Sequence, residues 1–363
     1  MSKVTNRLLP WEIMVLVIIL AVINSGCRPQ SPEWLEPLPS TTPAGYTFSS
    51  QLYSVYFTAP ANDDFKGGPD RFLVEALDQA RSQIDAALYD LNLWSLRNAL
   101  LRAHQRGVQV RLVVESDALD RPEIQELIAA GIPTVPDQAE SLMHNKFMVI
   151  DGAEVWTGSM NWTVNGAYRH LNNLVRLRSS RLAENFSFEF EEMFLEGYFG
   201  EDMLENTPHP VLTIDGIRVE TYFSPDDDTG LRLIELVLAA EESIDFMAYA
   251  FTSDSLAEAI LFQADQGLQV RGVLDAYQAG TGRGGEYQHL RNQGLAVYLD
   301  SHPEKLHHKV IIIDQSIVVT GSYNFTRSAE TQNDENTLII YDQDLASIYL
   351  REFEWIYQAA SSR

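Results

Sequence analysis

Cysteine, basic side chains and long apolar stretches are all scarce in this sequence. Its 363 residues include one cysteine, Cys27, so no disulfide can form within the chain. Lys and Arg number 26 against 51 Asp and Glu, which gives a formal charge of −25, and no basic run stands out. A surface this acidic repels polyanions at long range, so sequence-independent nucleic-acid binding needs a local basic groove. Hydrophobic residues make up 45% of the chain, which indicates a folded protein.

The N-terminal segment, residues 1–27, resembles a bacterial lipoprotein signal. Lys3 and Arg7 precede an apolar run over residues 13–23, and small residues lead to Cys27, which such a signal lipidates. The apolar run is shorter than the roughly 20 residues that span a bilayer. Asn24 departs from the usual pattern, so an uncleaved anchor and an ordinary cleaved signal stay as alternatives. Each predicts an exported protein, either tethered to a membrane or extracytoplasmic.

Residues 28–50 hold five prolines among Ser and Thr, a composition that predicts a tether rather than a core. Two similar halves follow, at residues 51–203 and 212–363, and Pro208 and Pro210 fall between them. In each half an alternating strand leads to an amphipathic helix, then to strand, helix and strand. This alternation predicts an α/β fold with helices flanking each sheet.

A polar motif occurs once in each half. The first copy places His144, Lys146 and Asp151 in a His-x-Lys-x4-Asp pattern, and Ser159 and Asn161 follow in Gly-Ser-x-Asn. The second copy repeats each of these residues 163 positions later, as His307, Lys309, Asp314, Ser322 and Asn324. Matched copies of this length are hard to obtain by chance.

The motif predicts phosphoryl chemistry. On an extended strand, a histidine and a lysine two positions apart project to the same face. The imidazole suits nucleophilic or acid/base work near neutral pH, and the ammonium with the Ser and Asn side chains forms a pocket for an oxyanion. Two copies brought face to face supply both a nucleophile and an acid for the leaving group, so displacement at phosphorus proceeds in two covalent steps. The lysines supply the positive charge, so no metal or cofactor is needed.

The paired motifs resemble those of the phospholipase D superfamily, and the copies cover nearly all of the chain after the tether. The resemblance implies two similar α/β domains, each a mixed sheet flanked by helices, related by a pseudo-twofold axis with a single active site at their interface. It implies a phosphohistidine intermediate, with His144 as nucleophile and His307 as general acid. Ser159, Asn161, Ser322 and Asn324 would bind the substrate phosphate, while Asp151 and Asp314 would anchor the loops after each strand.

The family also has an acidic residue that orients a catalytic histidine. Glu335 matches it in the second copy, within Asn-Asp-Glu-Asn, whereas the matching residue of the first copy is Asn172. An amide fixes a tautomer but stabilises an imidazolium less than a carboxylate does. The sequence therefore leaves open which histidine is the nucleophile.

Other residues have simpler interpretations. The Gly-x-Gly-x-x-Gly at 280–285 is more consistent with a flexible rim inserted into one copy than with a dinucleotide site. His308 is expected to face the other side of its strand rather than to bind a metal, and His170 is a surface histidine unless it lies near the site. Residues 226–228, three aspartates, predict a solvated turn or the start of a helix.

These features predict an exported phosphodiesterase that hydrolyses a phosphodiester, with a phospholipid headgroup as the first choice of substrate. An exported endonuclease of the same superfamily and a cardiolipin synthase-like phosphatidyl transferase are the enzymatic alternatives. A binding module that has lost its chemistry is the non-enzymatic alternative, and the intact motif residues argue against it. The oligomeric state is not indicated.

Overall fold

The computed structural model describes residues 47–58, 60, 65–281 and 285–362. The expected lipoprotein signal with Cys27, nearly all of the tether and part of the glycine-rich insertion lie outside these residues. No helix within the described ranges is long and apolar enough to cross a membrane.

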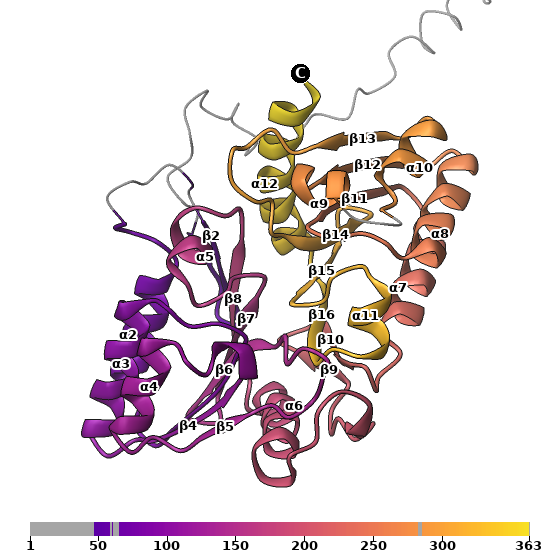
Figure 1. Cartoon of the computed structure of the whole chain (residues 1–363). Helices are drawn as coiled ribbons and strands as arrows, with labels where there is room; N and C mark the ends of the chain where they lie inside the picture. The colour runs from indigo at the N-terminus through magenta and orange to yellow at the C-terminus, as the bar shows by residue number, and fades with distance from the viewer. Residues whose placement is uncertain (1–46, 59, 61–64, 282–284, 363) are drawn as a thin grey trace, which may run out of the picture. The chain divides into compact units, whose positions relative to one another are not determined.

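Two eight-stranded sheets with the same strand order form the framework (Figure 1). The first runs β1-β2-β8-β7-β6-β3-β4-β5, and the second, in matching order, runs β9-β10-β16-β15-β14-β11-β12-β13. In each sheet the last three strands are parallel and the other neighbours are antiparallel. Both sheets are therefore mixed and helix-flanked, which confirms the predicted fold class.

The element bounds follow the chain. In the first half they are β1 (Thr47–Ser49), β2 (Tyr53–Phe57), α2 (Asp70–Gln79), β3 (Gln83–Leu88), α3 (Trp94–Gln105), β4 (Gln109–Val114), η1 (Ser116–Ala118), α4 (Pro122–Ala129), β5 (Thr134–Pro136), β6 (Lys146–Ile150), β7 (Glu154–Gly158), α5 (Val164–Tyr168), β8 (Asn173–Arg178), α6 (Ser180–Glu191), η2 (Glu192–Glu196) and η3 (Gly200–Asp202). In the second half they are β9 (Val211–Ile214), β10 (Ile217–Ser224), α7 (Thr229–Leu238), β11 (Ser243–Ala248), α8 (Asp254–Asp265), β12 (Gln269–Leu274), α9 (Ala276–Thr281), α10 (Tyr287–Asn292), β13 (Ala296–Leu299), β14 (Lys309–Ile313), β15 (Ile317–Gly321), α11 (Arg327–Thr331), β16 (Glu335–Tyr341) and α12 (Gln343–Ser361).

Two details differ from the sequence-based expectations. Paired structure begins at β1, inside the segment expected to be a tether, because Thr47–Ser49 bonds to β2 as an edge strand. The aspartates at 226–228 directly precede α7, as expected of a helix start, but they are not fully solvated. Asp226 and Asp227 are half-buried, and the carboxylate of Asp227 accepts the backbone N–H of Phe223 at 2.8 Å.

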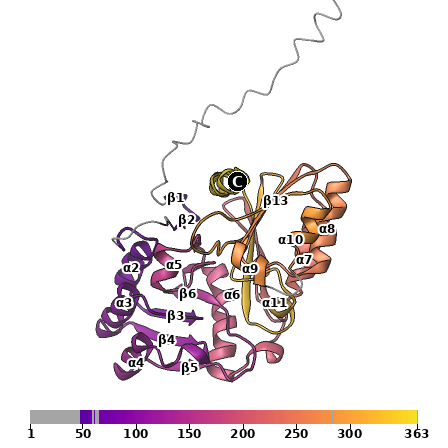
Figure 2. The same cartoon turned by 45° about the horizontal axis from the view of Figure 1, so that its top comes forward.

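Apolar side chains divide into an inner core and two outer cores. Helices α2, α3 and α4 cover the outer face of the first sheet, and α7, α8 and α10 cover that of the second (Figures 1 and 2). The inner core contains α6 and α12 together with strands from both sheets. Phe186 and Phe190 of α6, and Tyr349 and Phe353 of α12, are fully buried there, so the two halves fold around one shared core.

Asp151 and Asp314 hold equivalent turns together. The carboxylate of Asp151 accepts the backbone N–H groups of Arg81, Ser82 and Gln83 at 2.7 to 3.2 Å. Asp314 accepts those of Glu241, Glu242 and Ser243 in the same way. Each carboxylate therefore ties the end of the motif strand to the start of the neighbouring strand.

Replacing Asp151 by alanine is expected to lower the free energy of unfolding by about 1–3 kcal/mol, because several charge-assisted hydrogen bonds are lost together. Urea denaturation would measure the loss. Asp215→Ala is the matched control, since Asp215 also has a positive φ of 50° but lies exposed in the β9–β10 turn. Equal losses in the two variants would show that backbone conformation, rather than the carboxylate, matters at residue 151.

Candidate active site

The two histidine motifs enter the site through equivalent connections between the halves. The backbone N–H of His144 donates to the carbonyl of Asp334 at 3.0 Å, and that of His307 donates to the carbonyl of Leu171 at 2.9 Å. The segment before each motif strand therefore pairs with the segment before the last strand of the other half. This exchange brings both histidines to the interface between the halves.

Glu335 of the second half contacts His144 of the first. Both carboxylate oxygens lie 2.8 Å from Nδ1 of His144, and the Glu335 side chain is fully buried. A carboxylate at Nδ1 holds a proton there, which leaves the Nε2 lone pair available to a substrate. Glu335 also stabilises the positive charge that the ring acquires when Nε2 forms a bond.

His307 has neutral partners in the equivalent position. Its Nδ1 lies 3.0 Å from both the carbonyl oxygen of Ser159 and Oδ1 of Asn172. The Asn172 amide is oriented by its own bonds, because Nδ2 donates to the carbonyl of Gly166 and Oδ1 accepts the Ser159 hydroxyl. His307 therefore carries its proton on Nδ1, like His144, but without a carboxylate behind it.

The two lysines lie beneath aromatic rings. Nζ of Lys146 is 4.5 Å from the ring centroid of Tyr89, and Nζ of Lys309 is 4.9 Å from that of Tyr249. The same tyrosine rings lie 4.6 Å and 4.5 Å from the rings of His144 and His307. Each tyrosine thus covers both motif residues of its own half, and its ring face attracts the ammonium.

Burial shifts the protonation of all four motif groups toward the neutral form. Burial lowers the pKa of His144 to about 4, although Glu335 opposes the shift. Burial lowers the pKa of Lys146 to about 7 despite the nearby Glu335 and Glu115. The pKa values of His307 and Lys309 fall well below their usual ranges, first through burial and then through neighbouring cations. The site thus has too little negative charge to balance its two histidines and two lysines in their charged forms. An anionic substrate supplies the missing negative charge.

The motif serines make hydrogen bonds within the site, whereas the motif asparagines each have an unsatisfied side-chain oxygen. The Ser159 hydroxyl donates to Asn172 and accepts the N–H of Asn173, while the Ser322 hydroxyl accepts the N–H of Asn336. A direct contact from Ser159 to a phosphate would require exchange of its present bond. Asn161 and Asn324 each have a buried Oδ1 without a hydrogen-bond partner among the described residues, so their amides are unsatisfied without a ligand.

Equivalent amide networks cross the interface behind the site. Asn336 donates to Oδ1 of Asn145 at 2.7 Å and accepts the Thr157 hydroxyl. Asn173 has the same role in the other half, where it contacts His308 at 3.1 Å and accepts the Thr320 hydroxyl. His308 is thus part of the interface and is fully buried. Across the described ranges there is no group of three or more His, Cys, Asp or Glu side chains that could hold a metal ion.

Several residues near the site had no role assigned from the sequence. Tyr89 and Tyr249 could have been found from their equivalence, since they lie 160 positions apart at the ends of matched strands. Lys305 precedes the second motif, and nothing in the pattern marks it. His170, expected to be a surface residue unless it lay near the site, has its ring centroid 5.9 Å from that of His307.

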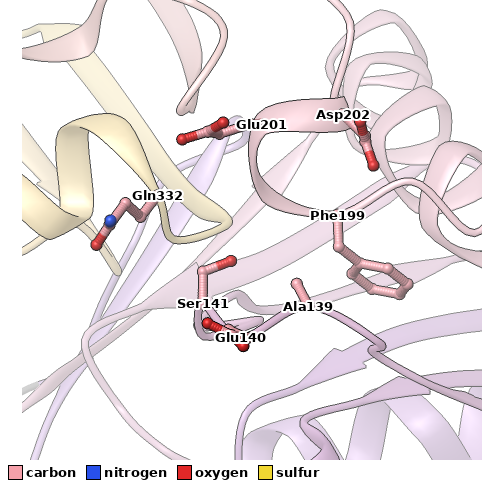
Figure 3. A pocket seen from close by; sticks show the side chains of 7 residues that line it. All are labelled: Ala139, Glu140, Ser141, Phe199, Glu201, Asp202 and Gln332. Carbon is pink, nitrogen blue, oxygen red and sulfur yellow. The ribbon is translucent and has the colours of Figure 1, made fainter.

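A pocket of 540 Å³ lies beside the segments that lead to His144 and Glu335. Ser141 and Gln332, each three residues before one of these side chains, line it together with Glu140, Phe199, Glu201 and Asp202. Figure 3 shows the acidic side chains coming from two different segments, the loop before β6 and η3. The pocket adds negative charge on the His144 side of the molecule.

Exchanging the acceptors behind the histidines is expected to move their pKa values in opposite directions. Glu335→Gln removes a carboxylate from His144, so the pKa of His144 should fall below about 4. Asn172→Asp places a carboxylate at Nδ1 of His307, so the pKa of His307 should rise. Nitrogen-15 NMR titration of the histidine rings would measure both shifts. An unchanged His144 in Glu335→Gln would contradict the electrostatic coupling.

Comparisons with known proteins agree with this architecture. The family model described as "Cardiolipin synthase, PLD-like domain" matches residues 73–194 and 233–357. Mitochondrial cardiolipin hydrolase of Homo sapiens is 38% identical over 128 residues, which are 35% of this chain and 50% of that protein. Phospholipase D of Rickettsia conorii is 34% identical over 145 residues, which are 40% of this chain and 71% of that protein.

The chain thus spans about half the length of the human relative. The crystal structure of phosphatidylserine synthase from Haemophilus influenzae shares the fold, with a TM-score of 0.65, 12% identity, and coverage of 86% of this chain and 87% of that one. Because the family model matches more than half of the sequence, with one match in each half, this chain belongs to the phospholipase D superfamily.

Proposed function

We propose that this protein hydrolyses a phosphodiester of a phospholipid through a covalent phosphohistidine on His144. The observation that carries the proposal is the pair of histidines from opposite halves, each with a proton fixed on Nδ1 and each beside a buried lysine. Each histidine is held by a residue of the other half, and the tyrosine ring beside it also covers the lysine of the same motif, so the four groups lie together at the interface between the halves.

In the first step, the Nε2 lone pair of His144 attacks phosphorus. A nitrogen–phosphorus bond forms while the bond from phosphorus to the leaving oxygen breaks, and that oxygen takes a proton from Nε2 of His307. Glu335 stabilises the charge that develops on the His144 ring. Lys146 and Lys309 neutralise the nonbridging oxygens of the phosphate.

In the second step, His307 accepts a proton from water, and the water oxygen attacks phosphorus. The nitrogen–phosphorus bond breaks, and its electrons return to Nε2 of His144. The pKa of His307 lies well below its usual range in the free protein, first through burial and then through the lysine charges. The phosphodiester anion offsets the lysine charges, so substrate binding raises the pKa of His307 and favours its protonated form.

The asymmetry between Glu335 and Asn172 assigns the two roles. A nucleophilic ring becomes cationic while it holds the phosphoryl group, and the carboxylate behind His144 stabilises that state. The general acid must give its proton away, and the neutral Asn172 behind His307 does not hold it. His144 is therefore the better nucleophile and His307 the better acid.

A phospholipid fits the chain better than a nucleic acid does. The formal charge of −25 disfavours long polyanions. The predicted N-terminal lipid or anchor would hold the enzyme at a membrane, where its substrate lies. The names of the human and rickettsial relatives, a cardiolipin hydrolase and a phospholipase D, agree with a lipid substrate. Transfer to an alcohol in place of water is the alternative reaction suggested by the name of the family model.

The covalent intermediate is expected to accumulate in His307→Ala. With a p-nitrophenyl phosphodiester such as p-nitrophenyl phosphocholine, the leaving phenolate needs no proton, so the first step proceeds in this variant. The second step lacks its base, so a stoichiometric burst of p-nitrophenolate should precede a slow steady rate. Intact-mass analysis should then show an acid-labile, base-stable adduct on the chain.

Two variants test whether that adduct is on His144. His144→Ala should give neither burst nor adduct and should release no headgroup from phospholipid–detergent micelles. His289→Ala, which changes a half-exposed histidine on α10, should match the natural protein. An adduct that persists in the double variant His144→Ala/His307→Ala would rule out His144 as the nucleophile.

The pH dependence of kcat/KM is expected to reflect His144, His307 and Lys146 in the free enzyme. His144 must be neutral to attack, so kcat/KM should rise with pH through about 4. His307 must be protonated, and its pKa lies well below its usual range, so kcat/KM should fall as pH rises above that pKa. The fall should become steeper above about 7, where the Lys146 cation is lost. Lys146→Arg retains its charge, so the steeper part of the alkaline limb should move upward. A steeper part that stays in place in Lys146→Arg would exclude Lys146 as its origin.

A further inference from the structure

Charged residues around the two histidines break the symmetry of the halves. On the His144 side, the groups that act on Lys146 are the carboxylates of Glu335, Glu115 and Asp90. On the His307 side, the equivalent Lys309 has the carboxylates of Glu335 and Asp275 near it but also the cations Lys146 and Lys305, and the cations Lys305, Lys309 and Arg169 act on His170. The His144 end of the site is therefore the more acidic end and the His307 end the more basic one.

The difference comes from side chains on an equivalent backbone. The N–H of Leu171 donates to the carbonyl of Lys305, and the N–H of Asp334 donates to the carbonyl of Leu142 in the other half. Lys305 thus corresponds to Leu142, 163 positions earlier. By the same spacing, His170 corresponds to Asn333 and Arg169 to Gln332. Each of the three basic residues has an uncharged counterpart beside His144.

Lys305 and His170 lie directly around His307. Nζ of Lys305 donates to the phenolic oxygen of Tyr249 at 3.1 Å, and the Tyr249 ring lies 4.5 Å from the His307 ring. The His170 ring is 5.9 Å from the His307 ring on the side contributed by the first half. Both side chains are only partly buried, so a ligand can reach them. Asp275 lies near Lys305, but this carboxylate does not distinguish the two halves, because Glu115 occupies the equivalent place in the half that holds His144.

The geometry of the reaction decides which part of the substrate lies at the basic end of the site. Displacement at phosphorus places the attacking and leaving atoms roughly in line, on opposite sides of phosphorus. His144 attacks from the acidic end, so the leaving alcohol departs toward His307 and extends into the basic end. A negative group on that alcohol meets Lys305, Arg169 and His170, whereas an uncharged alcohol has no partner for them.

We infer that Lys305 and His170 form a subsite for a second anionic group on the leaving alcohol, so that the preferred substrate is a phosphodiester whose leaving alcohol carries another phosphate. This inference rests on the proposed function for the assignment of the leaving side. Lys305 supplies a fixed cation, and His170 supplies a ring N–H. The chemistry is shared by a lipid with two linked phosphates and by an oligonucleotide, and the acidic surface favours the lipid.

Binding tests the subsite without turnover. Isothermal titration of the full chain should show glycerol 1,3-bisphosphate binding about tenfold more tightly than glycerol 1-phosphate, as expected for a charged hydrogen bond. Lys305→Leu and His170→Asn place the residue of the other half at each position, and each should reduce this ratio severalfold. Lys305→Arg should retain it. Equal affinities in the natural protein, or a ratio unchanged in both variants, would overturn the inference.

Hydrolysis tests the same preference on matched lipids. Cardiolipin and phosphatidylglycerol share a glycerol leaving group, which carries a second phosphate only in cardiolipin. In mixed micelles, kcat/KM should be about tenfold higher for cardiolipin. The cardiolipin-to-phosphatidylglycerol ratio should fall in Lys305→Leu and His170→Asn. It should stay unchanged in Arg181→Leu, which removes an exposed cation from α6.

The outcomes separate the two proposals. Hydrolysis of both lipids at equal rates, unaffected by the variants, supports the proposed function and overturns the subsite. Failure to hydrolyse either lipid, together with failure to release choline from phosphatidylcholine, overturns the proposed function, and the bisphosphate titration then decides the subsite alone. Cleavage of oligothymidylate in place of cardiolipin would assign the second phosphate to a nucleic acid and overturn the lipid source.

Discussion

Two histidines and two lysines are buried together at the interface between the halves, and the rest of the structure is arranged to tolerate this. Taking a cation out of water costs several kcal/mol unless it is paired. In this protein the compensation is partial: Tyr89 and Tyr249 cover the ammonium groups, and Glu335 supplies one carboxylate. The remaining deficit of negative charge makes the site receptive to a phosphate anion. Binding affinity and protonation of His307 are therefore linked through the same charge.

This arrangement depends on the shared inner core. α6 and α12 pack against strands of both sheets, so neither half completes its apolar packing alone. The amides of Asn173 and Asn336 then fix the registration of the halves, because each bonds to a side chain of the opposite motif segment. A small shift at this interface would separate Glu335 from His144 and Asn172 from His307. The geometry of the proposed catalytic groups therefore depends on the packing of the interface between the halves.

The two sheets share one strand order, and single side chains differ between the halves where the proposed reaction needs a direction. Glu335 and Asn172 occupy equivalent positions, and in the proposed reaction Glu335 stabilises a charged ring whereas Asn172 holds a neutral one. Lys305 and Leu142 differ in the same manner at the rim. The backbone at these places is unchanged, since the hydrogen bonds between the halves are equivalent. A reaction with a defined nucleophile and leaving side can thus arise on a nearly symmetric scaffold.

The α/β class, the two halves and the motif residues were predictable from the amino-acid sequence, because hydrophobic periodicity and a fixed spacing are local properties of the chain. Tertiary structure decided the partners: Glu335 lies 191 positions from His144 and reaches it only because the halves exchange their motif segments. It also decided that His170 lies beside His307 and that Tyr89 and Tyr249 cover the lysines. Such contacts depend on how the two sheets pack around a common core, and local patterns in the sequence do not specify this packing.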